Sequence, residues 1–250
     1  MDRCIGCNEC VEKCPGSALS RNSQGIIRDE KVCTGCSVCV DVCPALAHES
    51  VGWEITVEEV MSEIEKDIPF YDQSAGGVTF SGGEPFMQPQ FLLELLQQCG
   101  IRSIHRAVDT CMYTDIELIT QAAEHIDLFL IDLKHMDSSV HKKYTGLGNN
   151  RILQNIRSLA EMGAAITFRI PLVDGVNTDS TNLRQSAAFI TSLPGVYDVD
   201  VLPYHSNASA KYNKLGIVNG GDQLCKPNND VVLRSINILK DMGLNVQVGG

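Results

Sequence analysis

The sequence has few basic residues and no long apolar run. Its 20 lysines and arginines stand against 31 aspartates and glutamates, which gives a formal net charge of -11. Because no basic patch is available to displace counterions from phosphate, we expect no nucleic-acid partner. No apolar stretch approaches the length of a bilayer and no signal peptide precedes the first cysteines, so we expect a cytoplasmic protein that does not enter a membrane.

Most of the 11 cysteines stand in two runs with identical spacing. Each run reads Cys-x2-Cys-x2-Cys-x3-Cys-Pro, and the second begins 29 residues after the first. This spacing is typical of bacterial two-cluster ferredoxins, in which three cysteines of a run ligate one [4Fe–4S] cluster and the fourth reaches the other. It assigns one cluster to Cys4, Cys7, Cys10 and Cys43 and a second cluster to Cys33, Cys36, Cys39 and Cys14.

Two other interpretations of these cysteines, disulfides and zinc, fit the sequence less well. Disulfides are disfavoured because a chain without a signal peptide is expected in a reducing compartment. Zinc prefers four tetrahedral ligands, so the third cysteine of each run would be surplus. The remaining cysteines, Cys99, Cys111 and Cys225, are scattered and are expected to be buried or inert.

After the second Cys-Pro pair the composition changes, and a linker with a boundary near Gly52 separates a ferredoxin-like domain (1–52) from a second domain (53–250). A capping box at Thr56–Glu59 predicts a first helix. Short apolar strands are predicted at 78–80, 105–108, 128–133, 166–172, 199–202 and 245–248, with helices between them. This alternation predicts an α/β fold of parallel strands covered by helices, as a barrel or an open curved sheet.

Polar residues follow the predicted strands, where ligands bind in parallel α/β folds. The segment Ser81-Gly82-Gly83-Glu84-Pro85 has glycines that let the backbone approach a ligand, and Glu84 can anchor it. Asp132 and Lys134 fall on one side of their strand and could converge over a pocket. Taken singly, these features also fit a tight turn and a surface salt bridge.

Three further strand-end positions complete this set. Asp109-Thr110-Cys111 follows the strand predicted at 105–108. Arg169 lies within an apolar strand, where a charge needs a partner or a ligand. His205 closes Leu202-Pro203-Tyr204-His205 and, alone, would be a structural histidine. We expect the five groups together to line one site.

The combination of Ser81-Gly82-Gly83-Glu84-Pro85, Asp132-Leu133-Lys134 and Leu202-Pro203-Tyr204-His205 behind a two-cluster ferredoxin module resembles the activating enzymes of glycyl radical enzymes. These belong to the radical S-adenosylmethionine superfamily and include pyruvate formate-lyase activating enzymes. The resemblance implies a partial (βα) barrel of parallel strands that lacks its first strand, preceded by the small ferredoxin domain. It also implies a protein partner, the glycyl radical enzyme, and an electron donor of the flavodoxin or ferredoxin type.

The same resemblance implies roles for individual residues. Gly82 and Gly83 would bind the amino group of S-adenosylmethionine through backbone atoms. Asp132, Leu133 and Lys134 would line its carboxylate, and His205 would contact the nucleoside. A monovalent-cation site would involve Asp109, Thr110 and Asp132. A 5′-deoxyadenosyl radical, formed by reduction of the sulfonium, would remove a Cα hydrogen from a glycine of the partner.

One expected motif is absent from the sequence. In the family, a third [4Fe–4S] cluster reduces the sulfonium and is held by a Cys-x3-Cys-x2-Cys motif upstream of the ferredoxin module. No such motif occurs here, so we expect the chain to be an N-terminally truncated form that carries two clusters and does not turn over by itself. Without the upstream strand, the strand at 78–80 should form an open sheet edge.

Two rival functions remain open. The chain could be a non-enzymatic electron-transfer protein whose second domain is a docking surface. An aldolase-like barrel with Lys134 as a Schiff-base amine would also place a lysine at a strand end, but it gives no reason for the iron–sulfur module.

Overall fold

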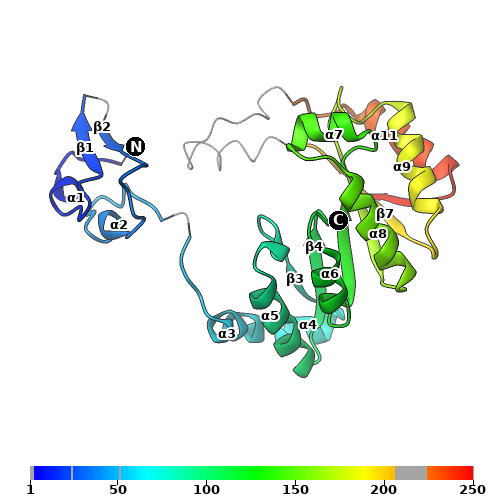
Figure 1. The fold of residues 1–250 in the computed structure, drawn as a ribbon, viewed down its shortest axis with the longest axis horizontal. Coiled ribbons are helices and arrows are strands. Elements are labelled where there is room, and N and C mark those ends of the chain that lie inside the picture. The colour runs from blue at the N-terminus through cyan, green and yellow to red at the C-terminus, as the bar shows by residue number, and fades with distance from the viewer. Residues whose placement is uncertain (1–2, 24, 51, 206–223, 250) are drawn as a thin grey trace. The chain divides into compact units, whose positions relative to one another are not determined.

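A computed structural model describes residues 3–23, 25–50, 52–205 and 224–249 of the chain. It divides into two compact units, Met1–Glu54 and Ile55–Gly250, which are described separately (Figure 1). The functional domains expected at 1–52 and 53–250 remain a prediction. Within the described ranges, no helix is both long and apolar enough to cross a membrane.

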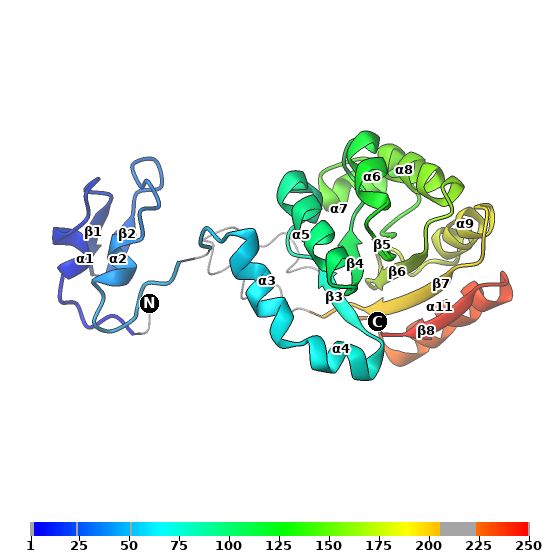
Figure 2. The same ribbon diagram turned by 90° about the horizontal axis from the view of Figure 1, so that it is seen from below.

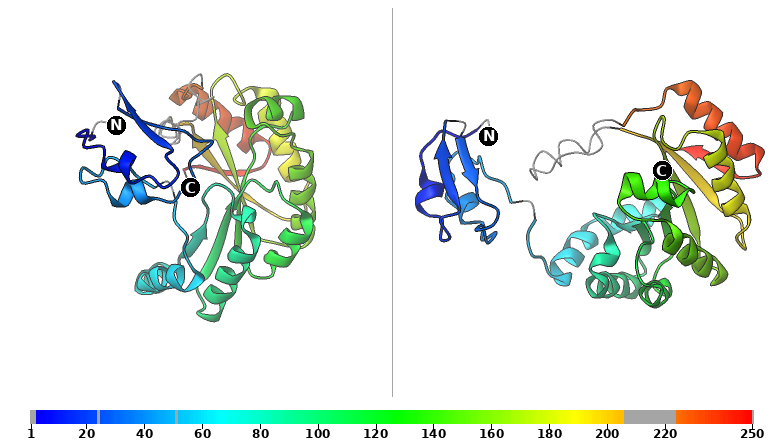
Figure 3. Two further views of the ribbon diagram at one scale, coloured as in Figure 1. Left: turned by 60° about the vertical axis from the view of Figure 1, so that its left-hand side comes forward. Right: turned by 45° about the horizontal axis from the view of Figure 1, so that its top comes forward.

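The first unit consists of two halves with similar backbone conformation, and equivalent residues of the halves are 29 positions apart in the sequence. It contains α1 (Glu9–Glu12), an antiparallel pair of strands, β1 (Leu19–Asn22) and β2 (Gly25–Arg28), and α2 (Val38–Asp41) (Figure 3). Left-handed φ angles recur at matching positions: 72° at Gly6 and 71° at Gly35. The glycines therefore serve the turns between cysteines, because this backbone region is open to glycine without steric cost.

The second unit contains one parallel sheet with the strand order β3-β4-β5-β6-β7-β8. Its strands are β3 (Gly77–Phe80), β4 (His105–Thr110), β5 (Leu128–Asp132), β6 (Ile166–Leu172), β7 (Asp198–Pro203) and β8 (Asn245–Val248). The helical elements are α3 (Val57–Lys66), α4 (Ile68–Ser74), η1 (Pro85–Met87), α5 (Pro89–Ile101), α6 (Ile116–Ala123), α7 (Ser138–Thr145), α8 (Asn150–Glu161), α9 (Ser180–Thr191) and α11 (Asn229–Asp241).

The helices cover one face of the curved sheet (Figure 2). Phe129, Ile131 and Phe168 project to this side and are fully buried in the main core. Successive side chains of a strand point to opposite faces, so the residues between them lie on the other, concave face. This arrangement confirms the predicted partial barrel of parallel strands. Among the described residues, β3 pairs only with β4 and is an edge strand, as expected.

Local sequence signals explain the start of the second unit. The Thr56 side chain accepts a hydrogen bond from the backbone N–H of Glu59, and the Glu59 side chain accepts one from the backbone of Thr56. This capping box was predicted from the sequence and fixes where α3 begins. Close contact between β3 and β4 requires Gly77, because a Cβ there would lie 2.0 Å from the carbonyl oxygen of His105.

Candidate functional site

In the first unit, four thiols surround one small cavity. Cys4, Cys7 and Cys10 come from the first run, and Cys43 comes from the end of the second. Ile5, Ile26, Ala45 and Ala47 contribute apolar walls. The fold thus brings together the four cysteines that the spacing assigned to one cluster. Nowhere in the described ranges do three Cys, His, Asp or Glu side chains converge as they would around a single metal ion.

The other four cysteines form a second group. Burial raises the pKa of the Cys39 thiol, and the neighbouring Cys33, Cys36 and Cys14 raise it further. Such mutual effects require the thiols to lie close together, since Coulomb interactions fall with distance. Cys14, from the first run, therefore lies with three cysteines of the second.

Backbone N–H groups donate to the two exchanged thiols at equivalent places. Ala18 donates to Sγ of Cys14 and Ala47 to Sγ of Cys43, each at 3.2 Å. The hydrogen bond from Ala47 is the main cause that lowers the pKa of Cys43. Hydrogen bonds of this kind favour the thiolate, the form that binds metal. The donor set fits two iron–sulfur clusters.

In the second unit, Glu84 joins the loop after β3 to the end of β4. Its carboxylate accepts hydrogen bonds from the hydroxyl of Thr110 and from the backbone N–H of Cys111, both at 2.8 Å. The prediction that Glu84 anchors the loop is confirmed. A Cβ on Gly82 or Gly83 would meet no atom within 4 Å, so their backbone lies open to a ligand.

Two ion pairs occupy the concave face near the strand ends. Lys134 Nζ lies 2.6 Å from Asp132 Oδ2, and Arg169 Nη1 lies 2.6 Å from Asp109 Oδ2. The Nε of Arg169 is buried without a hydrogen-bond partner in the described part of the chain. Each partly exposed carboxylate therefore already has a cation beside it. The expectation that Arg169 needs a partner is confirmed. Asp132 and Lys134 meet on one side of the sheet, as their alternation predicted, and form a salt bridge with each other.

The remaining predicted residues differ in how they are placed. Leu133 is 3% exposed and packs in the main core, so it offers a ligand only its backbone. Thr110 lies within β4, two residues beyond the predicted strand end, and the residue is 2% exposed. His205 is exposed directly after β7 and Tyr204, and residues 206–223 lie outside the described part of the chain.

The three scattered cysteines lie in separate places. Cys99 is buried against Met61, with 3.7 Å between the sulfur atoms. Cys111 follows β4, where burial raises its pKa to about 11. Cys225 is exposed, so of the two alternatives, buried or inert, burial does not apply to it. The fit for a third cluster is therefore poor, because the described residues gather no further set of thiols.

Sequence reasoning missed the buried polar residues around this site. Asp200 is only 5% exposed, stands beside Arg169 in the register of β6 and β7, and accepts a hydrogen bond from Gln247 Nε2 at 2.7 Å. Alternation on β7 could have revealed it, because Asp200 stands between two buried valines, Val199 and Val201. Four buried asparagines were missed as well: Asn149, Asn155, Asn177 and Asn182.

Two family models match the chain. The Radical SAM superfamily model covers residues 31–184, and the 4Fe-4S dicluster domain model covers residues 3–47. The chain is 40% identical over 252 residues to the trans-4-hydroxy-L-proline dehydratase activating enzyme of Clostridioides difficile. This alignment covers 100% of this chain and 83% of that protein. The chain is 39% identical to the choline trimethylamine-lyase activating enzyme of Oleidesulfovibrio alaskensis, over 85% of this chain and 71% of that one.

A solved structure of an activating enzyme is also similar to this chain. A domain of pyruvate-formate lyase-activating enzyme from Bacteroides vulgatus is 41% identical, with a TM-score of 0.61, and the match covers 70% of this chain and 99% of that domain. A radical SAM methyltransferase from Sphaerobacter thermophilus, 15% identical with a TM-score of 0.60, shares the fold. The chain therefore belongs to the radical SAM superfamily, within its family of glycyl radical enzyme activating enzymes.

Proposed function

We propose that this protein takes part in installing a glycyl radical on a partner enzyme. One-electron reduction of bound S-adenosylmethionine would give methionine and a 5′-deoxyadenosyl radical, which would take a Cα hydrogen from a glycine of that partner and become 5′-deoxyadenosine. The observation that carries the proposal is the pairing of an open Gly82–Gly83 backbone, tied by Glu84 to β4, with the Asp132–Lys134 pair at the end of β5.

Each group at the strand ends has a proposed task. The open backbone of Gly82 and Gly83 receives the amino group of the methionine portion. Lys134 exchanges its ion pair with Asp132 for the carboxylate of the ligand, since an ammonium keeps a compensating charge in either state. His205 contacts the nucleoside. A monovalent cation is proposed to bind at Asp109, Thr110 and Asp132.

The first unit has the proposed task of supplying electrons. One [4Fe–4S] cluster is held by Cys4, Cys7, Cys10 and Cys43, and the other by Cys33, Cys36, Cys39 and Cys14. The support is the cavity lined by the first set and the closeness of the second. We propose a flavodoxin or ferredoxin-type protein as the donor to these clusters and the cytoplasm as the compartment, because thiolate-held clusters need reducing conditions.

The partner is proposed to be a glycyl radical enzyme. Relatives of the chain are named as activating enzymes for trans-4-hydroxy-L-proline dehydratase, choline trimethylamine-lyase and isethionate sulfite-lyase. These partners differ in substrate although their activating enzymes are similar in sequence. The proposal is therefore limited to the class of partner.

The test is a calorimetric titration of the anaerobically reconstituted protein with S-adenosylmethionine. We expect one site, and we expect Lys134→Met to weaken the affinity about tenfold, as loss of one charged contact of roughly 1.4 kcal/mol would do. Lys143→Met is the matched control, because Lys143 is exposed on α7 outside the proposed site. An electron-transfer protein without this ligand would give no binding heat at millimolar concentration, and that outcome would overturn the proposal.

A further inference from the structure

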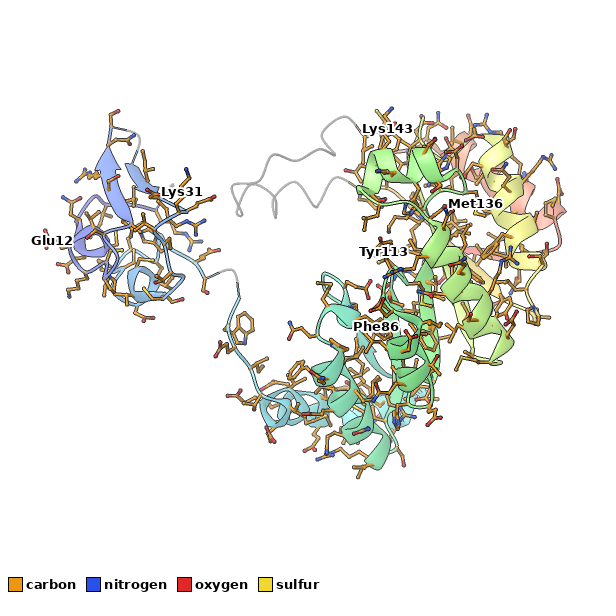
Figure 4. The ribbon with its side chains drawn as sticks, in the orientation of Figure 1. Glu12, Lys31, Phe86, Tyr113, Met136 and Lys143 are labelled. Atoms are coloured by element: carbon orange, nitrogen blue, oxygen red, sulfur yellow. The ribbon has the colours of Figure 1, made fainter. Side chains whose placement is uncertain are left out.

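The backbone of three consecutive residues, Lys134 to Met136, is held by side-chain amides from elsewhere in the second unit. Asn177 Nδ2 donates to the carbonyl of Lys134, and Asn149 Nδ2 donates to the carbonyls of His135 and Met136. Met136 lies in the segment after β5, Phe86 in the segment after β3 and Tyr113 in the segment after β4; Figure 4 labels all three. These segments lie at the carboxyl ends of the strands, on the same side of the sheet as the proposed site.

Among these asparagines, Asn177 makes three hydrogen bonds with its side chain. Its Nδ2 group donates to the carbonyl of Lys134 at 2.9 Å and to the carbonyl of Pro171, on β6, at 2.6 Å. Its Oδ1 accepts from the backbone N–H of Val173 at 2.8 Å. The residue is 2% exposed, so water does not compete for these bonds. One side chain thus sets the spacing between the ends of β5 and β6.

A second asparagine closes the connection. Asn182 Nδ2 donates to the backbone carbonyl of Asn177 at 3.0 Å, and Asn182 Oδ1 accepts from the backbone N–H of Met136 at 2.9 Å. Asn177 therefore holds the carbonyl of Lys134, and Asn182 holds the N–H of Met136. The two asparagines are hydrogen-bonded to each other. Asn182 is 3% exposed and lies on α9.

This arrangement leaves Lys134 fixed at its backbone but adjustable at its tip. Its side chain is 36% exposed and its ammonium is bonded to Asp132. A long, flexible lysine can place its charge accurately only if its main chain does not shift, because a small displacement of a contacting group weakens recognition. We propose that Asn177 is a positioning residue for Lys134. The proposal rests on the role of Lys134 in binding S-adenosylmethionine given above.

A purely structural role for Asn177 makes a different prediction. If the amide only stabilised the fold, its loss would affect ligand affinity equally whether or not Lys134 were present. If it acts through Lys134, its effect should vanish once the lysine side chain is gone. Double-mutant cycles separate these cases, since residues that act together are not additive.

The experiment measures S-adenosylmethionine affinity by anaerobic calorimetry in the reconstituted full chain, in a cycle of Asn177→Ala, Lys134→Met and the double variant. We expect Asn177→Ala to weaken binding about tenfold alone and to have no further effect beside Lys134→Met. Asn177→Asp is a second variant in case Asn177→Ala does not fold: it keeps the acceptor for Val173 and removes both donors. Ser235→Ala is the control, because Ser235 is fully buried and hydrogen-bonded on α11.

Hydrogen exchange provides a readout that does not depend on the ligand. We expect peptides covering 134–137 to lose protection in the Asn177 variants, whereas peptides of α11 keep theirs. An equal loss of affinity in both backgrounds, or unchanged exchange at 134–137, would overturn the positioning role. A loss in Lys134→Met with none in the Asn177 variants would also overturn it while leaving the proposed function intact. Unchanged affinity in Lys134→Met would overturn both.

Discussion

Glu84 and Thr110 are joined by a 2.8 Å hydrogen bond from the threonine hydroxyl to the carboxylate, although 26 residues separate them in the chain. The same carboxylate accepts from the backbone N–H of Cys111 and, at 3.3 Å, from that of Phe86. Three donors from two segments therefore converge on one acceptor. These hydrogen bonds to one carboxylate hold the glycine loop beside the end of β4.

Glu84→Gln should release the glycine loop. The variant keeps the shape of the side chain but replaces one acceptor oxygen by a donor that faces other donors, a mismatch worth about 1–3 kcal/mol. We expect S-adenosylmethionine affinity to fall about tenfold and hydrogen exchange at 81–86 to accelerate. Glu94→Gln, at an exposed position on α5, is the control and should change neither quantity. Affinity equal to that of the unmodified protein would show that the loop is held by other contacts.

Iron content should report how the cysteines are shared. The reconstituted chain should hold about eight irons, and a value near twelve would show that a third cluster assembles. Cys10→Ser with Cys43→Ser should leave about four irons, because both side chains line the same cavity. Cys10→Ser with Cys39→Ser is the matched pair and should lose nearly all of the iron. Equal losses in the two double variants would refute the exchange of the fourth cysteine between runs.

The pair Arg106–Asp127 should make stability depend on pH. Two hydrogen bonds, at 2.8 and 2.9 Å, join the guanidinium to the carboxylate, and they are the main cause that lowers the pKa of Asp127. A depressed pKa contributes stability that is present above the unfolded-state value, near 3.8, and is lost as the pH falls through the folded-state value.

Asp127→Asn should therefore lower the unfolding free energy by about 1 kcal/mol at pH 7, allowing for solvent at a carboxylate that is 35% exposed. The deficit should shrink below about pH 4. Urea unfolding followed by circular dichroism measures both. Asp115→Asn is the control, since its ion pair with Arg151 is mostly exposed, and it should cost much less. A deficit that stayed constant down to pH 3 would count against the ion pair as its source.

Cys111 should resist alkylation. With a pKa of about 11, raised first by burial and then by its hydrogen bond to Glu84, about one thiol in a thousand is ionised at pH 8. The exposed Cys225 should react far sooner with iodoacetamide in the reconstituted protein, as followed by peptide mass mapping. Unfolding in urea should remove the difference. Comparable rates in the folded protein would mean that Cys111 is not shielded.

The sequence predicted the elements whose local signals agree with their packing. The strands at 166–172 and 245–248 have the expected bounds, and the Thr56 capping box starts α3. Helix α7 was missed because Ser138–Thr145 has only one buried side chain, His141, and so lacks an apolar stripe. Its start is set by Asp137, whose carboxylate accepts hydrogen bonds from Ser139 and Val140.

The candidate site was predictable only in part, and for a physical reason. Glycines and charged residues at strand ends leave a signal in the sequence, so Gly82, Asp132 and Lys134 could be named. Asn177 carries no such signal, because a buried polar side chain is defined by partners that the fold brings from distant segments. Asn177 finds its partners on the segments after β5 and β6.

The exchange of Cys14 and Cys43 between the two halves of the first unit has a consequence for folding as well as for metal binding. In the proposed assignment, each cluster takes three thiols from one half and the fourth from the other, so a single copy of the 29-residue repeat would lack the fourth ligand in its proposed place. Loading one side also requires the other side to be folded. Each cluster therefore depends on both halves of the unit being in place.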